Sequence, residues 1–581
     1  MSKYERYCVP SAPIARETWA WNMYGAGVEH IGREGRPERF PVPEPQRDQL
    51  LVRVDAVGMC YSDVKLIKQG GGHPKLYGRD LATQPTRLGH EVALTVMRVG
   101  ADLRERFHPG QRLALQPDIY RQGRSTAYGY TIPGGLTQFH LIGPEVLDAD
   151  QQSYLLPIAA DLGYAAAALT EPWACVEAAY TQRRRLAPRP GGTMWIAGRG
   201  DSGVDYAFSA GLEAPSTIVL SDVPQSLLAA AQRQAHERGA RLVRRDGVSP
   251  AGYPALNAEL AGDAGFDDIV LLDPSSAQTV SAAAALIARR GTLNLVGQAP
   301  LDGLVPVDIG RIHYDYTAYV GNRGPDIAAS YGERRNRCEL RAGGTALLVG
   351  AGGPMGQMHV QRAIELAAGP GLIVASEVNP TRLADLEAAF AAMAQAHGKR
   401  LLTFNPAAGS ESLRELIARQ TGGRGADDVI VCAPVASLAA EAAAVMAGDG
   451  MLVLFAGCPN GTLAPLDLSR VYLHNAQYTG TSGSTVADQA LVIAKAGDGR
   501  LSPERSVAAI GGIEAAQEGV RALLEGRYPG KVVIFPQLTG LPLLGLAELE
   551  EALPSVAACL APGSVWTREA ERALIERFWQ P

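Results

Sequence analysis

The sequence predicts an α/β protein with a β-rich N-terminal portion and two tandem copies of a doubly wound, parallel-sheet domain. Three observations support this fold class. Short β-branched runs ending at glycines mark the N-terminal portion, strand and helix patterns alternate from residue 191, and that alternation occurs twice. The 581 residues are enough for several domains, and an apolar fraction of 46% supplies several buried cores.

Composition and charge narrow the class of protein. The net charge is −6 and the pI about 6.0, which argues against nucleic acid or an anionic membrane surface as the main partner. No apolar run reaches the roughly 20 residues of a membrane span, and the first residues lack the apolar core of a signal peptide. Seven scattered cysteines are typical of reduced thiols. We therefore expect a cytoplasmic protein that binds a small molecule.

Strands account for much of the N-terminal portion. Residues 50–59 (LLVRVDAVGM) and 91–100 (EVALTVMRVG) combine β-branched residues with glycines near their ends. Residues 110–115 (GQRLAL) continue the pattern after a turn, and residues 530–538 (GKVVIFPQL) form one more predicted strand near the C-terminus. The tail after 539 has helical patterns.

Two segments of the chain match each other almost column for column. Residues 191–203 match 343–356 with one insertion, and residues 292–324 match 451–483. An offset that stays near 150–160 residues indicates a duplicated domain rather than two unrelated ones. The expected boundaries are a catalytic domain at 1–185 completed by 525–581, a first copy at 186–335 and a second copy at 336–524.

The first copy carries a dinucleotide-binding fingerprint of the Rossmann type. Gly198, Gly200 and Gly203 follow a strand and are expected to precede a helix, where glycines allow a tight turn and close approach to a pyrophosphate. Asp222 then stands where an acid binds the ribose diol, which favours NAD over NADP. Asp201 places a carboxylate inside this anion-binding loop, where it could instead cap the helix.

The second copy carries a longer glycine-rich turn. The turn begins at Gly350, and its pattern fits Ala-x-Gly-x-x-Gly on Ala351, Gly353 and Gly356. Glu377 then occupies the ribose-diol position. Either both copies bind a cofactor or one is structural or regulatory. The sequence does not decide which copy holds the working NAD.

Three distant motifs carry metal-ligand chemistry. The first, GMCYSDVK, holds Cys60, Ser62 and Asp63; the second, LGHEVAL, holds His90 and Glu91; the third, LTEPWAC, holds Glu171. A thiolate, an imidazole and a carboxylate suit a catalytic Zn²⁺ with three protein ligands and one open position. Each motif is weak evidence when taken singly.

The order of these motifs resembles the zinc-dependent medium-chain dehydrogenases. GMCYSD, GHE, EP, a glycine-rich strand–turn–helix and a final GKVVI follow one another as in the polyol, sorbitol and threonine dehydrogenase branch. GYTIPGGLTQFHL, TGGRGADDVIV and VAAIGGIEAAQEGV are similar to a sorbose-phosphate reductase-like subgroup. The resemblance covers residues 45–185 and 343–538 and implies a GroES-like catalytic domain.

The resemblance also implies a role for each motif residue. Cys60 and His90 would bind zinc, and Glu91 or Glu171 would take the remaining protein position. Ser62 would pass the alcohol proton toward solvent, and Asp63 would orient His90. One catalytic zinc is expected and no structural zinc, because residues 112–141 contain no cysteine.

We therefore expect a zinc- and NAD-dependent dehydrogenase acting on the alcohol or ketone of a polyol, sugar or cyclitol, in a cleft between zinc and nicotinamide. The alternatives are an epimerase or isomerase that retains its NAD, a scaffold role for one copy, and a zinc-free reductase. Strands at 316–321 and 476–480 are expected to pair edge to edge and make an internal pseudo-dimer. A further homodimer of whole chains stays open.

Overall fold

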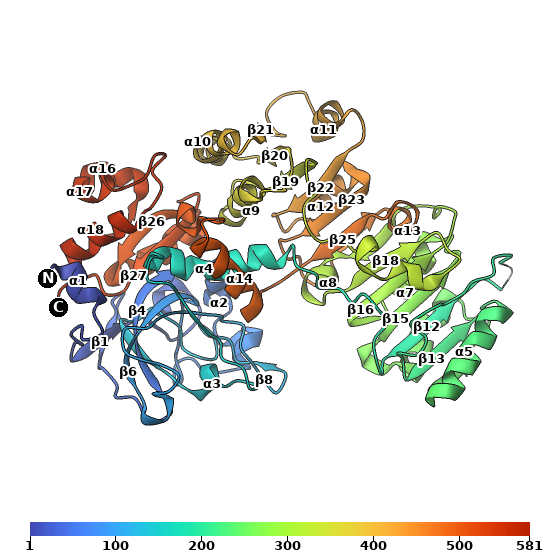
Figure 1. Ribbon diagram of the computed structural model, residues 1–581, viewed down its shortest axis with the longest axis horizontal. Helices are drawn as coiled ribbons and strands as arrows, with labels where there is room; N and C mark the ends of the chain where they lie inside the picture. Colours follow the sequence, from blue (N-terminus) through green and yellow to red (C-terminus); the bar gives the residue numbers. More distant parts are fainter. Residues whose placement is uncertain (201) are drawn as a thin grey trace. The chain divides into compact units, whose positions relative to one another are not determined.

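The computed structural model describes residues 1–200 and 202–581, which form two compact units (Figure 1). Unit 1 comprises Met1–Ala178, Gly353–Met358 and Gly483–Pro581, and unit 2 comprises Ala179–Gly352 and His359–Ser482. The chain returns to unit 1 at Gly483, earlier than the expected boundary at residue 525. Among the described residues, no helix combines the length and apolarity that crossing a bilayer requires.

Unit 1 is built on an eight-stranded sheet in which distant parts of the chain lie side by side. β4 (Leu50–Gly58) pairs antiparallel with β6 (Glu91–Val99) on one side and with β27 (Lys531–Phe535) on the other. All three strands were predicted from their β-branched residues. The structure buries those residues within this sheet. The pairing brings the first, second and last motifs of the chain to one end of adjacent strands.

The eight-stranded sheet is completed by β7 (Arg112–Leu115), β10 (Phe139–Ile142), β11 (Leu155–Pro157), β26 (Val507–Gly512) and β28 (Leu544–Gly545). Three separate two-stranded pairs are β1 (Glu17–Ala20) with β3 (Glu38–Pro41), β2 (Asn22–Met23) with β5 (Thr86–Arg87), and β8 (Tyr120–Arg121) with β9 (Arg124–Ser125). The helices of unit 1 are α1 (Lys3–Cys8), α2 (Tyr61–Gln69), α3 (Pro144–Leu147), α4 (Tyr164–Ala178), α14 (Val486–Gly497), α15 (Ala516–Glu525), α16 (Leu549–Ala552), α17 (Pro554–Ala557) and α18 (Arg568–Phe578). The helices α16–α18 confirm the helical pattern of the tail.

Helix α4 carries Glu171 and is fixed at its N-terminus by the C-terminal tail. The carboxylate of Glu571, on α18, accepts hydrogen bonds from the backbone N–H groups of Tyr164 (2.7 Å) and Ala165 (2.9 Å). These are donors that a helix leaves without intrahelical partners, and a negative charge there is favourable. The apolar helix is buried along nearly its whole length, so its register, and with it Glu171, is well defined.

Unit 2 contains two six-stranded parallel sheets with the same strand order. The first sheet runs β14-β13-β12-β15-β16-β18 and the second β21-β20-β19-β22-β23-β25, which is the order 3-2-1-4-5-6 of a doubly wound dinucleotide-binding domain. The two parallel sheets agree with the predicted duplication.

The elements of the two copies follow the same order, with one exception described below, and they belong to unit 2 apart from the start of α9 (Pro354–Glu365), which lies within the Gly353–Met358 segment of unit 1. The first copy has β12 (Thr193–Ala197), β13 (Thr217–Ser221), α5 (Gln225–Arg238), β14 (Arg241–Arg244), α6 (Tyr253–Leu260), β15 (Phe266–Leu272), α7 (Ala277–Ala284), β16 (Ile287–Val296), β17 (Val305–Asp308), α8 (Ile309–Tyr314) and β18 (Ala318–Asn322). The second has β19 (Thr345–Val349), α9 (Pro354–Glu365), β20 (Leu372–Ser376), α10 (Pro380–Ala396), β21 (Arg400–Phe404), α11 (Leu413–Thr421), β22 (Ala426–Val431), α12 (Ala436–Ala444), β23 (Met446–Leu454), β24 (Leu463–Leu466), α13 (Ser469–His474) and β25 (Gln477–Gly480).

Individual hydrogen bonds also recur in both copies. Asp268 accepts the backbone N–H of Arg189 at 2.8 Å, and Asp428 accepts that of Arg341 at 2.7 Å. Both aspartates are buried near the start of the fourth strand of their sheet, where they tie it to the segment that precedes the first strand. Such matched local bonding indicates that the two copies share one structural plan.

The first copy departs from the prediction at its glycine-rich turn. A helix was expected after Gly203, but residues 198–200 and 202–216, between β12 and β13, contain none. Tyr206 and Phe208 are buried while Ala207 between them is exposed, an alternation typical of extended chain, and Gly211 has a φ of 118°. The segment is therefore extended, whereas helix α9 follows the corresponding turn of the second copy.

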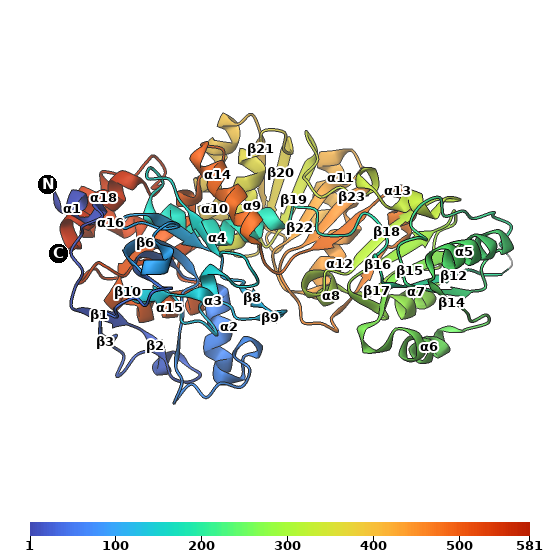
Figure 2. The same cartoon turned by 60° about the horizontal axis from the view of Figure 1, so that its bottom comes forward.

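The two copies contact each other through exchanged elements. β17 of the first pairs antiparallel with β24 of the second, with Val305 opposite Leu466. Helix α13 of the second copy lies on β18 of the first, as Figures 1 and 2 both show, and a Cβ at Gly321 would come within 2.7 Å of Tyr472. One continuous apolar core contains residues of both copies.

The expected edge-to-edge pairing of 316–321 with 476–480 is wrong in its detail. β18 and β25 are the last strands of two separate sheets, and no described ladder joins them. The reason lies in the neighbouring helices: α13 packs on β18, and α8 packs on β25 where a Cβ at Gly480 would lie 3.2 Å from His313. β18 and β25 still contact each other, and each also contacts a helix of the other copy, so neither edge is left fully open.

Candidate metal and active site

Cys60, His90 and Glu91 converge in unit 1, as the sequence predicted for a metal site. Their ligand atoms all lie within 4.8 Å of one another. Cys60 is the N-cap residue of α2, directly after β4, and Glu91 begins β6 directly after His90. Because β4 and β6 are paired, the two motifs end at the same place in the sheet.

Asp63 holds the two ligand segments together. Its carboxylate accepts the backbone N–H of Cys60 at 3.0 Å, and its Oδ1 lies 3.3 Å from Nδ1 of His90 and 3.5 Å from the N–H of Gly89. Burial works to lower the pKa of His90, but the Asp63 carboxylate and the Cys60 side chain raise it well above its usual range. A buried carboxylate in this place is suited to orient the imidazole.

Ser62 lies between the predicted ligands. Its hydroxyl donates to Sγ of Cys60 at 2.9 Å and its Oγ is 3.3 Å from Nε2 of His90. The His90 ring therefore directs Nε2 toward Ser62 and Cys60, and Nδ1 toward Asp63. Ser62 is therefore within reach of any group bound by these two residues.

Glu91 forms a buried ion pair that the sequence did not reveal. Its Oε1 contacts Nζ of Lys531, and the two side chains are 0% and 4% exposed. The carboxylate lies across the strand at Gly58, where a Cβ would be only 2.0 Å from Oε2. Gly58 thus leaves room for Glu91, on β6, to reach Lys531, on β27. Burial works to lower the pKa of Lys531, but Glu91 raises it.

Glu171 is buried near the cluster, although the described metal-binding group does not include it. Burial raises the pKa of Glu171 to about 7, with Glu91 and Asp118 adding to the rise and His90 and Lys531 opposing it. Cys175, one turn further along α4, donates its thiol toward Oε1 of Glu171 at 3.9 Å. Nearby positive charge would stabilise the ionised form of this carboxyl.

The residues present fit a divalent cation. Oε2 of Glu91 is buried and has no hydrogen-bond partner, which is costly unless something else satisfies it. Cys60, His90 and a carboxylate supply the S, N and O donors that Zn²⁺ accepts. Since Lys531 already neutralises Glu91, the thiolate of Cys60 and the carboxylate of Glu171 would together balance two positive charges.

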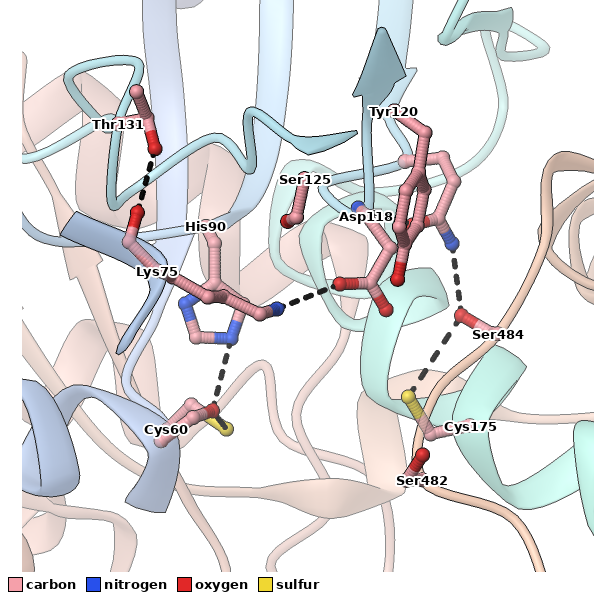
Figure 3. A network of polar contacts seen from close by, with 12 residues as sticks. Cys60, Lys75, His90, Asp118, Tyr120, Ser125, Thr131, Cys175, Ser482 and Ser484 are labelled. Atoms are coloured by element: carbon pink, nitrogen blue, oxygen red, sulfur yellow. Dashed lines mark hydrogen bonds and ion pairs between the residues drawn. The ribbon is translucent and has the colours of Figure 1, made fainter. Parts of the chain in front are cut away.

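A second polar group stands beside the cluster (Figure 3). Nζ of Lys75 is 2.9 Å from Oδ1 of Asp118, and it lies 4.9 Å from the centroid of the Tyr130 ring, whose other neighbours include the His90 ring at 6.0 Å. Ser484, drawn in the same view, accepts a hydrogen bond from the thiol of Cys175 at 3.7 Å. Sequence analysis assigned no role to Lys75, Asp118, Tyr130 or Ser484.

The glycine-rich turn of the second copy leads into a helix. Gly350 has a φ of 75°, which favours glycine, and Gly353 directly precedes α9, in whose first turn Gly356 lies. Glu377, after β20, accepts the backbone N–H of Gly352 at 3.0 Å, and a Cβ at Gly352 would be 2.7 Å from its side chain. The predicted loop and acid are therefore together, next to a helix N-terminus.

The fingerprint of the first copy lies in a different setting. Gly198, Gly200 and Gly203 follow β12, but the extended segment after them offers no helix N-terminus to a phosphate. The carboxylate of Asp222 accepts the backbone N–H of Gly247 at 3.0 Å, and the N–H of Gly200 bonds the carbonyl of Asp222 at 2.9 Å. Asp201 lies outside the described residues.

Three charged residues near the cluster escaped sequence reasoning. Lys531 stands in GKVVI, which contributed to the family resemblance, so a signal for it existed. Lys75 and Asp118 belong to loops whose contacts depend on the fold, and no spacing rule links them to the metal motifs.

Comparisons with known proteins agree with this geometry. Residues 46–147 match the model of the alcohol dehydrogenase GroES-like domain. The chain is 31% identical over 323 residues to L-sorbose 1-phosphate reductase of Klebsiella pneumoniae, covering 53% of this chain and 75% of that protein. It is 26% identical over 299 residues to sorbitol dehydrogenase of Bacillus subtilis, covering 49% and 77% respectively.

Solved structures share the fold. The crystal structure of 2R,3R-butanediol dehydrogenase from Bacillus subtilis superposes with a TM-score of 0.50 at 15% identity, covering 89% of this chain and 99% of that one. A GroES-like β domain, Rossmann-like sheets and a Cys–His–Glu cluster together define an oxidoreductase of the alcohol dehydrogenase type. The chain belongs to the zinc-type, medium-chain alcohol dehydrogenase superfamily, near L-sorbose 1-phosphate reductase and sorbitol dehydrogenase.

Proposed function

We propose that this protein transfers a hydride between NAD and the secondary alcohol or ketone of a polyol or sugar, with zinc at the Cys60–His90 cluster. The observation that carries the proposal is the convergence of Cys60, His90 and Glu91 within 4.8 Å, from two motifs about thirty residues apart. The names of the similar proteins, which include a sugar-phosphate reductase and a sorbitol dehydrogenase, support the substrate class.

Cys60, His90 and one carboxylate, that of Glu91 or of Glu171, are the proposed metal ligands, and Glu91 is paired with Lys531 in either case. Bound there, Zn²⁺ would act as a Lewis acid that makes a substrate hydroxyl more acidic. Asp63 keeps the imidazole and the Cys60 backbone in place before any ligand arrives. The Ser62 hydroxyl is positioned to relay the substrate proton: Oγ would accept it while the hydroxyl's own proton passes on toward solvent, and Oγ already lies beside the two ligand atoms.

The second copy is the proposed cofactor domain. Its turn leads into α9, so backbone N–H groups and the positive end of the helix dipole are available to a pyrophosphate. Glu377 stands where the ribose diol would bind and disfavours a 2′-phosphate, which supports NAD over NADP. The first copy, without that helix, serves as a permanent structural partner of the second.

Zinc analysis and cofactor reduction test this proposal. We expect about one zinc per chain, loss of that zinc in Cys60→Ser, and steady NADH release at 340 nm with sorbitol and NAD as a first substrate pair. Nucleotide titration should saturate at one NADH per chain. Absence of zinc from the wild-type chain purified without chelators would contradict the proposal.

An enzyme that retains its NAD and returns the hydride is the alternative. Its main support was the presence of two cofactor-type domains, and the missing helix in the first copy removes that support. Substrate turnover without net NADH release would restore it.

A further inference from the structure

Lys75 and Asp118 form an ion pair beside the candidate metal site (Figure 3). Lys75 Nζ lies 2.9 Å from Asp118 Oδ1, and the side chains keep 35% and 26% of their surface exposed. Partly exposed ion pairs of this kind contribute modestly to stability. They do keep free hydrogen-bonding capacity: the ammonium has three donors, and Oδ2 of Asp118 has open lone pairs.

Both residues are held in place by their backbones. Thr131 donates its hydroxyl to the carbonyl of Lys75 at 2.7 Å, as Figure 3 shows, and the N–H of Asp118 bonds Oε1 of Gln116 at 2.7 Å. Gln116 in turn donates to Ser484 at 2.8 Å. The pair is therefore preorganised rather than a chance contact of two mobile side chains.

The pair lies close to the metal cluster. The Tyr130 ring adjoins both the Lys75 ammonium (4.9 Å) and the His90 ring (6.0 Å). A Cβ at residue 483 would lie 2.6 Å from Oδ2 of Asp118, so the glycine at this position allows the carboxylate to pack against the main chain.

We infer that Lys75 and Asp118 bind hydroxyl groups of the substrate adjacent to the reacting carbon and so select polyols over simple alcohols. A hydroxyl both donates and accepts, so it can bridge a carboxylate acceptor and an ammonium donor at once. A phosphate has no donor for Asp118 and is repelled by it, which disfavours a phosphoryl group at this position. This inference rests on the proposed function and specifies its substrate class.

Steady-state kinetics on a matched set of variants test the inference. Asp118→Asn keeps the shape but removes the charge, Lys75→Met removes the ammonium, and Lys75→Arg preserves a cation. Asp148→Asn, which breaks an exposed pair with Arg106 elsewhere in unit 1, is the control. Zinc content and melting temperature are measured for each variant to show that fold and metal are retained.

We expect kcat/KM for sorbitol to fall by about 10- to 100-fold in Asp118→Asn and Lys75→Met, mainly through KM. The value for 2-butanol should change by less than about threefold, because that substrate has no second hydroxyl to lose. Lys75→Arg should recover part of the loss. Equal losses with both alcohols, or no loss with sorbitol, would overturn the inference. A loss in Lys75→Met that is confined to sorbitol 6-phosphate would assign Lys75 to phosphate and overturn it as well.

Binding without turnover separates this inference from the proposed function. Saturation-transfer NMR should detect sorbitol on the wild-type chain and a much weaker signal on Asp118→Asn. If sorbitol binds in this way but no NADH forms with any alcohol, the proposed reaction fails and the binding site stands. If the wild-type chain neither binds nor oxidises sorbitol, both are refuted.

Discussion

The buried pair of Glu91 and Lys531 provides the sharpest test of how charge is arranged at the metal cluster. The side chains are 0% and 4% exposed, so removing one partner leaves the other charge buried and uncompensated. Lys531→Met and Glu91→Gln should each lower the free energy of unfolding by about 3–5 kcal/mol. The double variant buries no net charge and should cost about as much as one single variant, which gives a coupling free energy of about 3 kcal/mol or more.

Tryptophan fluorescence in denaturant is a suitable assay for this cycle. Five of the six tryptophans, Trp19, Trp21, Trp173, Trp566 and Trp579, belong to unit 1, so the signal follows the unit that contains the pair. Chelator in the buffer removes any contribution from bound metal. The exposed pair of Arg106 and Asp148 is the control, with an expected coupling below about 1 kcal/mol.

Additive single effects, with a coupling below about 0.5 kcal/mol, would refute the ion pair. Zinc content then separates the two possible roles of Glu91. If Glu171 is the ligand, Glu91→Gln should keep its zinc while Glu171→Gln loses most of it. Loss of zinc in Glu91→Gln alone would reverse the assignment.

Three further predictions concern the metal, the cofactor and the contact between the copies. His90→Ala should lose its zinc and at least about 10³-fold of kcat without unfolding, which metal analysis and circular dichroism would verify; full activity would be incompatible with the site. Gly352→Val would place its side chain against Glu377 and should abolish NADH binding, as measured by fluorescence titration. Gly203→Ala, whose Cβ meets nothing within 4 Å, should still bind one NADH per chain. The reverse result would assign the cofactor to the first copy. Gly321→Val would place its Cβ against the Leu295 carbonyl oxygen and 2.7 Å from Tyr472, and should destabilise unit 2 by about 1–3 kcal/mol, measured as faster proteolysis between the copies; unchanged proteolysis would mean that the copies are not tightly packed there.

Local sequence signals predicted the strands well and one helix badly. β4, β6 and β27 are β-branched and buried, so their pattern and their environment agree. The turn of the first copy has all three fingerprint glycines, yet Tyr206 and Phe208 after it are buried without a helix. The Tyr206 hydroxyl donates a hydrogen bond to Asp273 at 2.6 Å. The fingerprint glycines show that a tight turn is possible, but the residues after the turn determine whether a helix follows.

The metal motifs show the same division. Cys60 and His90 were predicted as metal ligands because a thiolate and an imidazole in these motifs suit a zinc site. The partner of Glu91 could not be found, because Lys531 stands 440 residues away and meets it only through the pairing of β4 with β27. The glycine that makes room for it, Gly58, has no signature of its own.

The sequence alone determined the duplication, the order of the metal motifs and the family they resemble, because these depend on residue identity and spacing along the chain. Only the tertiary structure decided which copy offers a helix to a pyrophosphate and which charges surround the cluster. Both depend on packing between segments hundreds of residues apart, and no local pattern encodes which side chains such packing will bring together.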